Sequence, residues 1–298
     1  MDQPVVDYYI KDGNFKNLAR VLTRVENDLP GSKEILHSLN TSSASMVVGI
    51  TGPPGAGKST LVNGLINLLS AEGKRIAVVA IDPTSPFNLG SLLGDRIRMT
   101  EQFNKPNVFI RSLATRGSLG GLSAKTIEIV DVLKSAGFDY ILVETVGVGQ
   151  SEVEIVGLAD ITIVVLVPES GDEIQGIKSG LMEIADIFVV NKADREGADT
   201  FANNLKKIVH QKAGHVPVIK TVAERSEGIR ELMEAIEQYG AKVSQQKPFL
   251  LAEKAWRLLQ RERMGFLNRK KLQQDIAEAS KKADFNLYVF VSNLLRNS

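Results

Sequence analysis

Seven apolar segments, each the length of one β-strand, recur through the middle of the 298-residue chain and limit the folds it can adopt. They are rich in β-branched residues, most are continuously apolar, and longer stretches with helical spacing separate most of them. Continuously apolar strands are buried on both faces, which is typical of a parallel sheet covered by helices on both sides. The sequence therefore predicts an α/β fold with a doubly wound, mostly parallel sheet. The expected strands are 46–51, 75–82, 107–111, 139–144, 161–167, 187–191 and 216–220.

Helical patterns flank this strand-rich region. Before it, apolar residues recur at helical spacing from Phe15 to Val25, until Pro30 interrupts the pattern. After about residue 240 the strand signal ends; Pro248 opens one helix, and further helical patterns follow. We therefore expect three parts: an N-terminal helical extension (1–40), a strand-and-helix domain (46–240) and a C-terminal helical arm (241–298).

The composition indicates a globular protein from a reducing compartment. Hydrophobic residues make up 43% of the chain and charged residues 24%, and there is no cysteine. The lack of cysteine excludes disulfides, thiolate nucleophiles and cysteine zinc sites. The longest apolar runs are far shorter than the roughly 20 residues of a membrane helix. The acidic start resembles neither a secretory signal nor a transit peptide. We therefore expect a cytoplasmic protein with no membrane segment.

The net charge of +1 averages two unlike parts of the chain. Residues 240–298 hold 12 lysines and arginines against 5 aspartates and glutamates, so the rest of the chain is acidic. A basic excess on helices is more often a set of solvated faces than a docking surface for a polyanion. No nucleic-acid-binding motif accompanies it, so we expect no nucleic-acid partner. We interpret this segment as an oligomerisation or partner-docking arm.

A phosphate-binding pattern follows the first expected strand directly. Residues 52–59 read Gly-Pro-Pro-Gly-Ala-Gly-Lys-Ser, which fits G-x-x-x-x-G-K-[ST], and a helix is expected to begin at Lys58. In such a loop the backbone N–H groups surround a polyphosphate, Lys58 reaches the outer phosphates, and Ser59 supplies a magnesium ligand. The expected nucleotide-binding residues of this loop are Gly52, Gly55, Ala56, Gly57, Lys58, Ser59 and Thr60.

A second motif predicts which base is bound. A later strand ends in Asn191-Lys192-Ala193-Asp194. The Asp194 carboxylate can accept hydrogens from both N1 and N2 of guanine, a pair of donors that adenine lacks. Asn191 can address the opposite edge of the base while the stem of Lys192 packs on the ring. A weaker signal places backbone contacts to the base at Val222 and Ala223. GTP and GDP are therefore the expected ligands.

The strand between these two motifs ends in a carboxylate, Glu144, with Gly147 three residues later. This is a variant of the D-x-x-G box. Glu144 would hold a magnesium-bound water and the Gly147 N–H would sense the γ-phosphate, so that residues 145–156 would act as a switch. Many GTPases carry a water-positioning glutamine directly after this glycine, but here Val148 stands there and Gln150 lies two residues further on. We therefore predict slow intrinsic hydrolysis, below about one turnover per second without a partner. The catalytic candidates are Lys58, Glu144, Gly147 and Gln150.

Two aspartates in the region of the second expected strand and the stretch after it could reach the metal side of the triphosphate. Asp82 ends that strand, and Asp95 lies in the stretch Gly94-Asp-Arg-Ile-Arg-Met. Asp95 would serve equally well as a surface charge on a helix. The expected Mg²⁺ ligands are Ser59, Asp82, Asp95 and Glu144.

Together these motifs resemble the MeaB/ArgK family of P-loop GTPases, which are G-protein chaperones of adenosylcobalamin-dependent methylmalonyl-CoA mutase. The resemblance covers nearly the whole chain. It implies GTP hydrolysis that gates loading and protection of the cobalamin on the mutase, and a C-terminal arm that mediates homodimerisation. The segments that carry it are 52–59, 80–86, 94–99, 144–151, 168–178 and 191–194.

The resemblance also implies a further switch at 168–178 that couples the nucleotide state to the mutase through Asp172 and Lys178. From the residues alone this stretch could equally be a strand-to-helix loop with Asp172 as a helix cap. One departure from the family pattern is Val222, which replaces an expected serine and affects affinity more than identity.

Competing interpretations concern the use of the nucleotide. A small-molecule kinase and a GTP-dependent adaptor with negligible turnover both stay open. Related GTPases that insert nickel or handle zinc rely on cysteine- and histidine-bearing sites. This chain has no cysteine, and its three histidines show no ligand spacing.

Overall fold

The computed structural model describes the chain in separate stretches. They are 14–40, 44–82, 100–114, 124–145, 155–169, 179–212 and 216–240, followed by 252, 255–256, 258–260, 269–279, 281 and 287–296. The chain divides into two compact units, Met1–Leu250 and Leu251–Ser298. The finer division into three parts stays a prediction.

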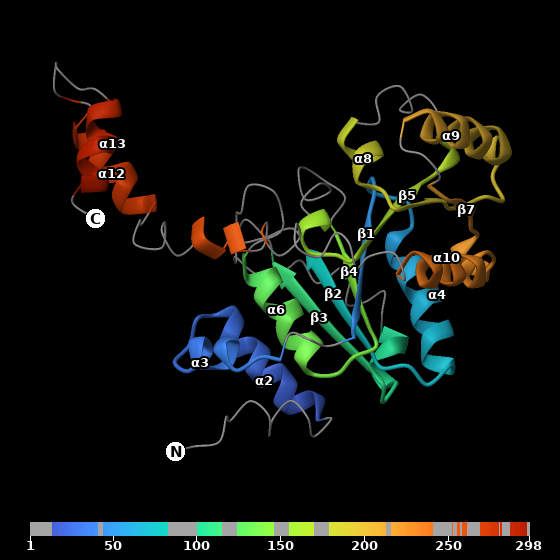
Figure 1. Ribbon diagram of the computed structural model, residues 1–298, viewed down its shortest axis with the longest axis horizontal. Helices are drawn as coiled ribbons and strands as arrows, with labels where there is room; N and C mark the ends of the chain where they lie inside the picture. Colours follow the sequence, from blue (N-terminus) through green and yellow to red (C-terminus); the bar gives the residue numbers. More distant parts are fainter. Residues whose placement is uncertain are drawn as a thin grey trace. The chain divides into compact units, whose positions relative to one another are not determined.

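The first unit is built on a seven-stranded sheet in which all neighbouring strands are parallel (Figure 1). The strand order is β3-β2-β4-β1-β5-β6-β7. This confirms the predicted α/β fold and all seven expected strands. Their bounds are β1 (Met46–Thr51), β2 (Ile76–Asp82), β3 (Val108–Ala114), β4 (Tyr140–Glu144), β5 (Ile161–Leu166), β6 (Ile187–Val190) and β7 (Val218–Lys220).

Helices cover both faces of the sheet, because alternate strand residues point to opposite sides and both sets are apolar. The face that carries Val48 and Ile50 packs against α4 (Lys58–Ala71) and α10 (Ile229–Gly240). The opposite face, which carries Val47 and Val164, packs against the other helices that the structure describes in this unit. These are α2 (Phe15–Glu26), α3 (Ser32–His37), α6 (Ala124–Ser135), α8 (Ser179–Ile184) and α9 (Ala198–Lys212).

Short 3-10 turns and two further helices complete the described elements. The turns are η1 (Thr100–Asn104), η2 (Ile155–Gly157) and η4 (Ala223–Arg225). The second unit contains α12 (Arg269–Ala279) and α13 (Leu287–Arg296). Within the described stretches, no helix combines the length and the apolar character needed to cross a membrane.

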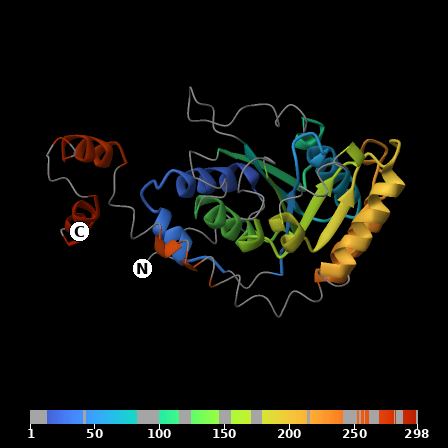
Figure 2. The same ribbon diagram turned by 90° about the horizontal axis from the view of Figure 1, so that it is seen from above.

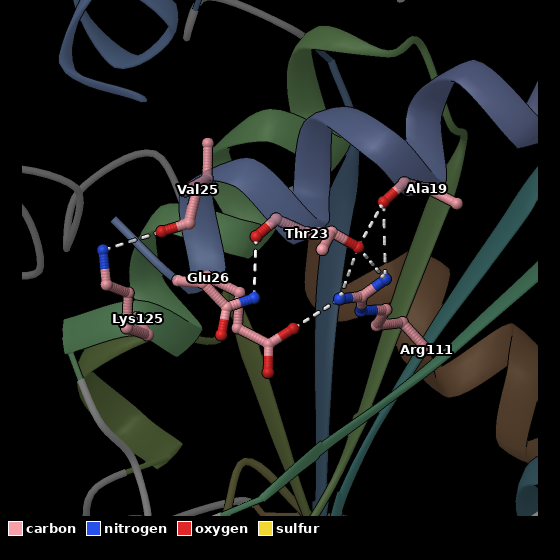
Figure 3. Close-up of polar contacts among 7 residues, drawn as sticks. Ala19, Thr23, Val25, Glu26, Arg111 and Lys125 are labelled. Atoms are coloured by element: carbon pink, nitrogen blue, oxygen red, sulfur yellow. Dashed lines mark hydrogen bonds and ion pairs between the residues drawn. The ribbon is translucent and has the colours of Figure 1, made fainter. Parts of the chain in front are cut away.

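Helix α2 shares the core of the first unit and lies beside α6 (Figure 2). Its apolar face is buried together with residues of β3 and α6, and the ring of Phe15 meets that of Phe109 edge-on at 5.5 Å. Figure 3 shows polar contacts at the end of the same helix, where Arg111 of β3 forms an ion pair with Glu26. Lys125 of α6 donates to the Val25 carbonyl oxygen at 2.7 Å. Cations near a helix C terminus interact favourably with its dipole, so these contacts favour this docked position.

Three aspartates connect neighbouring strands at the edge of the sheet where the parallel strands begin. Each stands one residue before a strand, and its carboxylate accepts the backbone N–H of a residue at the start of the neighbouring strand. Strand-end N–H groups need such partners when the ladder does not supply them. These contacts therefore fix strand register. The pairs are Asp139 Oδ2 with Arg75 N (2.7 Å), Asp160 Oδ2 with Val47 N (2.9 Å) and Asp186 Oδ2 with Thr162 N (2.8 Å).

Asp186 links pH to stability. Burial raises the pKa of Asp186, while hydrogen bonds from the Tyr239 hydroxyl and the Thr162 N–H oppose this shift. The folded protein therefore keeps this proton at pH values where the unfolded chain has released it. The free energy of unfolding consequently falls as pH rises above the ordinary aspartate pKa of 3.8.

We expect Asp186→Asn to remove this part of the pH dependence. An asparagine amide can still accept from Thr162 and bond to Tyr239, but it does not ionise. The free energy of unfolding of each protein is measured in urea at several pH values. The value for the variant minus the value for the wild type should increase from about pH 4 to pH 7. Curves that stay parallel over this range would contradict the prediction.

Candidate nucleotide-binding site

The described candidate residues gather at the carboxyl-terminal edge of the sheet. Gly52 follows β1, Asp82 and Glu144 end β2 and β4, and Asn191 follows β6. Because the strands are parallel, these ends lie on one edge of the sheet. Open α/β sheets bind their ligands in the crevice at this edge.

The loop between β1 and α4 depends on glycine backbone geometry. Gly52, Gly55 and Gly57 have φ angles of 139°, 78° and 85°. A Cβ on Gly52 would lie 2.1 Å from the carbonyl oxygen of Val165, so a larger residue does not fit. The buried Lys58 stabilises the start of the loop, because its Nζ donates a hydrogen bond to the Gly52 carbonyl oxygen at 2.9 Å. The glycine-rich loop and one ammonium group thus lie at the start of α4, an arrangement typical of a polyphosphate site.

Ser59 and Glu144 place a hydroxyl and a carboxylate together beside this loop. Ser59, in the first turn of α4, donates from Oγ to Glu144 Oε1 at 2.6 Å, and the two residues are only 8% and 5% exposed. Hydroxyl and carboxylate oxygens are hard ligands that suit Mg²⁺, which takes one or two protein ligands together with phosphates and water. These two residues therefore fit a magnesium ion. Among the described residues, no group of three or more histidine, aspartate or glutamate side chains could hold a metal.

Asn191 joins the guanine motif to the phosphate loop. Its side chain is 2% exposed, and its Nδ2 donates to the Ala56 carbonyl oxygen at 2.9 Å. Its Oδ1 accepts from Thr221 Oγ1 at 3.0 Å and from the Ala223 N–H at 3.1 Å. One amide group thus connects three loops, which follow β1, β6 and β7. The amide nitrogen carries two N–H groups and Ala56 engages one of them, so the second could donate to a base. This part of Asn191 in binding the base stays a prediction.

Lys192 adds a second link between the same loops. It has a left-handed backbone with φ of 57°, and its Nζ donates to the Gly55 carbonyl oxygen at 2.7 Å. Its aliphatic stem therefore extends across the phosphate loop, consistent with a surface on which a base ring could pack.

The Asp194 carboxylate is the solvent-exposed acidic group of the guanine motif. Its side chain is 37% exposed, and Arg225 Nη2 lies 3.4 Å from Oδ2. The neighbouring Val222 and Ala223 are buried, and Ala223 opens η4. A solvent-accessible carboxylate here can accept both donors of the guanine N1–N2 edge.

Several predicted site residues fall in other parts of the chain. Asp95, Gly147, Gln150, Asp172 and Lys178 lie outside the described residues, as does the side chain of Asp82. Their roles stay predictions.

An ion pair that the sequence did not reveal connects two parts of the site. Glu169 lies at the start of the expected partner switch, 168–178, and Arg195 follows the guanine motif; their side chains form the ion pair Arg195 Nη1 to Glu169 Oε1. The hydrogen bond from Arg195 lowers the pKa of Glu169. No sequence motif marks this contact, because it depends on β5 and β6 being neighbours.

Comparison with known proteins identifies the family. The family model described as methylmalonyl Co-A mutase-associated GTPase MeaB matches residues 18–281. A Pyrococcus horikoshii protein assigned as a GTPase is 51% identical over 238 residues, which are 77% of this chain and 75% of that protein. The GTPase ArgK of Escherichia coli is 38% identical over 212 residues, which are 70% of this chain and 63% of ArgK.

A solved structure shows the same fold over nearly the full chain. The crystal structure of a LAO/AO transport system kinase superposes with a TM-score of 0.69 at 25% sequence identity, covering 99% of this chain and 98% of that one. The family match, the relatives and the parallel P-loop architecture agree with one another. The chain belongs to the MeaB family and is a P-loop GTPase.

Proposed function

We propose that this GTPase gates the loading and protection of adenosylcobalamin on methylmalonyl-CoA mutase or a related cobalamin-dependent acyl-CoA mutase. One observation carries the proposal: the family model that matches residues 18–281 is described as mutase-associated. The solvent-accessible carboxylate of Asp194 supports guanine recognition, which such a switch requires.

In this proposal the chain's own groups position GTP for attack by water on the γ-phosphate. The N–H groups of the phosphate loop and Lys58 hold the outer phosphates, and Asp194 holds the base. Ser59 and Glu144 would hold Mg²⁺, which would offset the phosphate charge when bound. Phosphoryl transfer depends mainly on such positioning and electrostatic stabilisation. Gly147 and Gln150 are proposed to complete the site.

We also propose a cytoplasmic homodimer whose contacts are made by the arm 241–298. The nucleotide state would reach the mutase through Asp172 and Lys178. The basic excess of this arm supports a docking or assembly role, since none of the nucleotide-site motifs lies in it.

The test is co-purification of the full chain with the mutase of its host, in GDP and in a non-hydrolysable GTP analogue. We expect association that differs between the two nucleotides and GTP hydrolysis that the mutase accelerates above the slow intrinsic rate. Equal association, or none, in both nucleotides would remove the chaperone function and leave the GTPase assignment intact.

Two alternatives give different results in the same samples. An adaptor with negligible turnover would bind the mutase without accelerated GTP loss. A small-molecule kinase is suggested by the name of the protein that shares the fold at 25% identity. A kinase that uses ATP would be protected from thermal unfolding by ATP, whereas the proposed site would be protected by GTP and GDP.

A further inference from the structure

Two buried threonines meet where β1 and β4 leave the sheet. The two strands pair in parallel from Met46↔Tyr140 to Ile50↔Glu144, which makes Thr51 and Thr145 the next residues along. Thr51 directly precedes the phosphate loop, and Thr145 directly follows Glu144.

These threonines are joined by their side chains. Thr145 Oγ1 donates to Thr51 Oγ1 at 2.9 Å, and the two residues are 1% and 0% exposed. A buried hydroxyl is costly unless it is hydrogen-bonded, whereas valine would fill a similar volume at no such cost. Valine, isoleucine and leucine fill most other buried positions of these two strands. Packing alone therefore does not account for a pair of hydroxyls here.

The pair connects the two halves of the nucleotide site. On one side, Thr51 directly precedes Gly52, and the Gly52 carbonyl oxygen accepts a hydrogen bond from Lys58 Nζ at 2.9 Å. On the other side, Thr145 directly follows Glu144, and the Glu144 carboxylate accepts a hydrogen bond from the Ser59 hydroxyl at 2.6 Å. A fixed distance between the threonines therefore restrains the distance between the phosphate loop and the proposed metal-binding carboxylate.

We propose that the Thr51–Thr145 pair is a positioning clamp for GTP hydrolysis. It acts through Gly52 and Glu144 and makes no contact with the nucleotide itself. A displacement of about 1 Å in such a site can cost about a hundredfold in rate, because transition-state stabilisation depends on preorganised groups. Binding of GDP depends mainly on the loop N–H groups and the guanine motif, so it is less sensitive to this distance. The clamp rests on the GTPase activity of the family and not on the mutase role.

The test uses valine variants of the full chain. Thr145→Val, Thr51→Val and the double variant remove the bond, Thr145→Ser keeps a hydroxyl, and Thr162→Val is the matched control. Thr162 is a 1%-exposed threonine of β5 whose backbone N–H binds Asp186 at the other edge of the sheet. We expect kcat for GTP to fall at least about tenfold in the double variant, with KM and GDP affinity within about threefold of wild type. Thr145→Ser and Thr162→Val should hydrolyse GTP like the wild type.

The double variant separates positioning from packing. Each single variant leaves one buried hydroxyl without its partner and lowers the free energy of unfolding, whereas the double variant removes both hydroxyls and should regain most of that loss. A double variant that regains both stability and hydrolysis would show that the pair only fills the core. A fall in GDP affinity equal to the fall in kcat would also overturn the proposal. No mutase is present in these measurements, so their outcome is independent of the chaperone proposal.

Discussion

Replacement of Gly57 by alanine is expected to weaken binding of GDP and GTP at least about a hundredfold, because two penalties act at one position. Gly57 has φ of 85°, a conformation that costs an L-residue about 1–2 kcal/mol. In addition, the new Cβ would lie 2.3 Å from Asn191 Nδ2. The Asn191 amide cannot turn aside without losing its bonds to Ala56, Thr221 and Ala223. The substitution should therefore separate the phosphate loop from the guanine motif.

Gly73→Ala is the matched control for this variant. Gly73 follows α4 with φ of 75°, and a Cβ added there would have nothing within 4 Å. It should lose only the stability that the backbone strain costs and should bind nucleotide normally. Titration of each variant with a fluorescent GDP analogue, together with urea unfolding, measures both effects. Normal GDP affinity in Gly57→Ala would contradict the coupling between the two loops.

Asp194→Asn is expected to exchange guanine for xanthine as the preferred base. Xanthine has a carbonyl oxygen where guanine has the N2 amino group. The asparagine amide can donate to that oxygen while it accepts from N1–H, but it offers guanine only one acceptor. We expect GTP affinity to fall at least about a hundredfold and xanthosine triphosphate affinity to rise, because the asparagine amide group would face the guanine N2 amino group with a donor in place of an acceptor.

The fold should tolerate this change. The Asp194 side chain is 37% exposed, and its ion pair with Arg225 spans 3.4 Å, so little stability depends on it. Asp199→Asn, at an exposed aspartate of α9 that pairs with Lys220, is the control and should leave both affinities unchanged. A folded Asp194→Asn protein that still prefers GTP would disprove the assignment of Asp194 as the base-selecting residue.

The strands were predictable because each is a continuous apolar run, but their ends were not. The run that begins at Val216 enters the sheet only at Val218, since Pro217 has no N–H to donate, although its carbonyl oxygen accepts from Phe188. On the far side of the sheet, the outermost strand β3 continues past its expected end at residue 111 to Ala114, which pairs with Asp82. Such ends depend on the neighbouring strand, which a local pattern does not contain.

The site was predictable to the level of its motifs. The phosphate loop and the guanine motif predicted residues that lie at one edge of the sheet, as the structure has them. The bridging role of Asn191 was not predictable, because it requires the loops after β1, β6 and β7 to lie together. The threonine pair was hidden for the same reason, since 94 residues separate its members. Likewise, the helical spacing from Phe15 to Val25 predicted a buried face on α2 but not its partners.

The aspartates before β4, β5 and β6 place strand alignment at one edge of the sheet, while the nucleotide-site loops lie at the other edge. Their carboxylates lock strand alignment at the edge remote from the nucleotide. A loop at the nucleotide edge can then be lengthened, shortened or rearranged without sliding the strand that leads into it. The same scaffold can thus carry differently shaped loops while the sheet keeps its register.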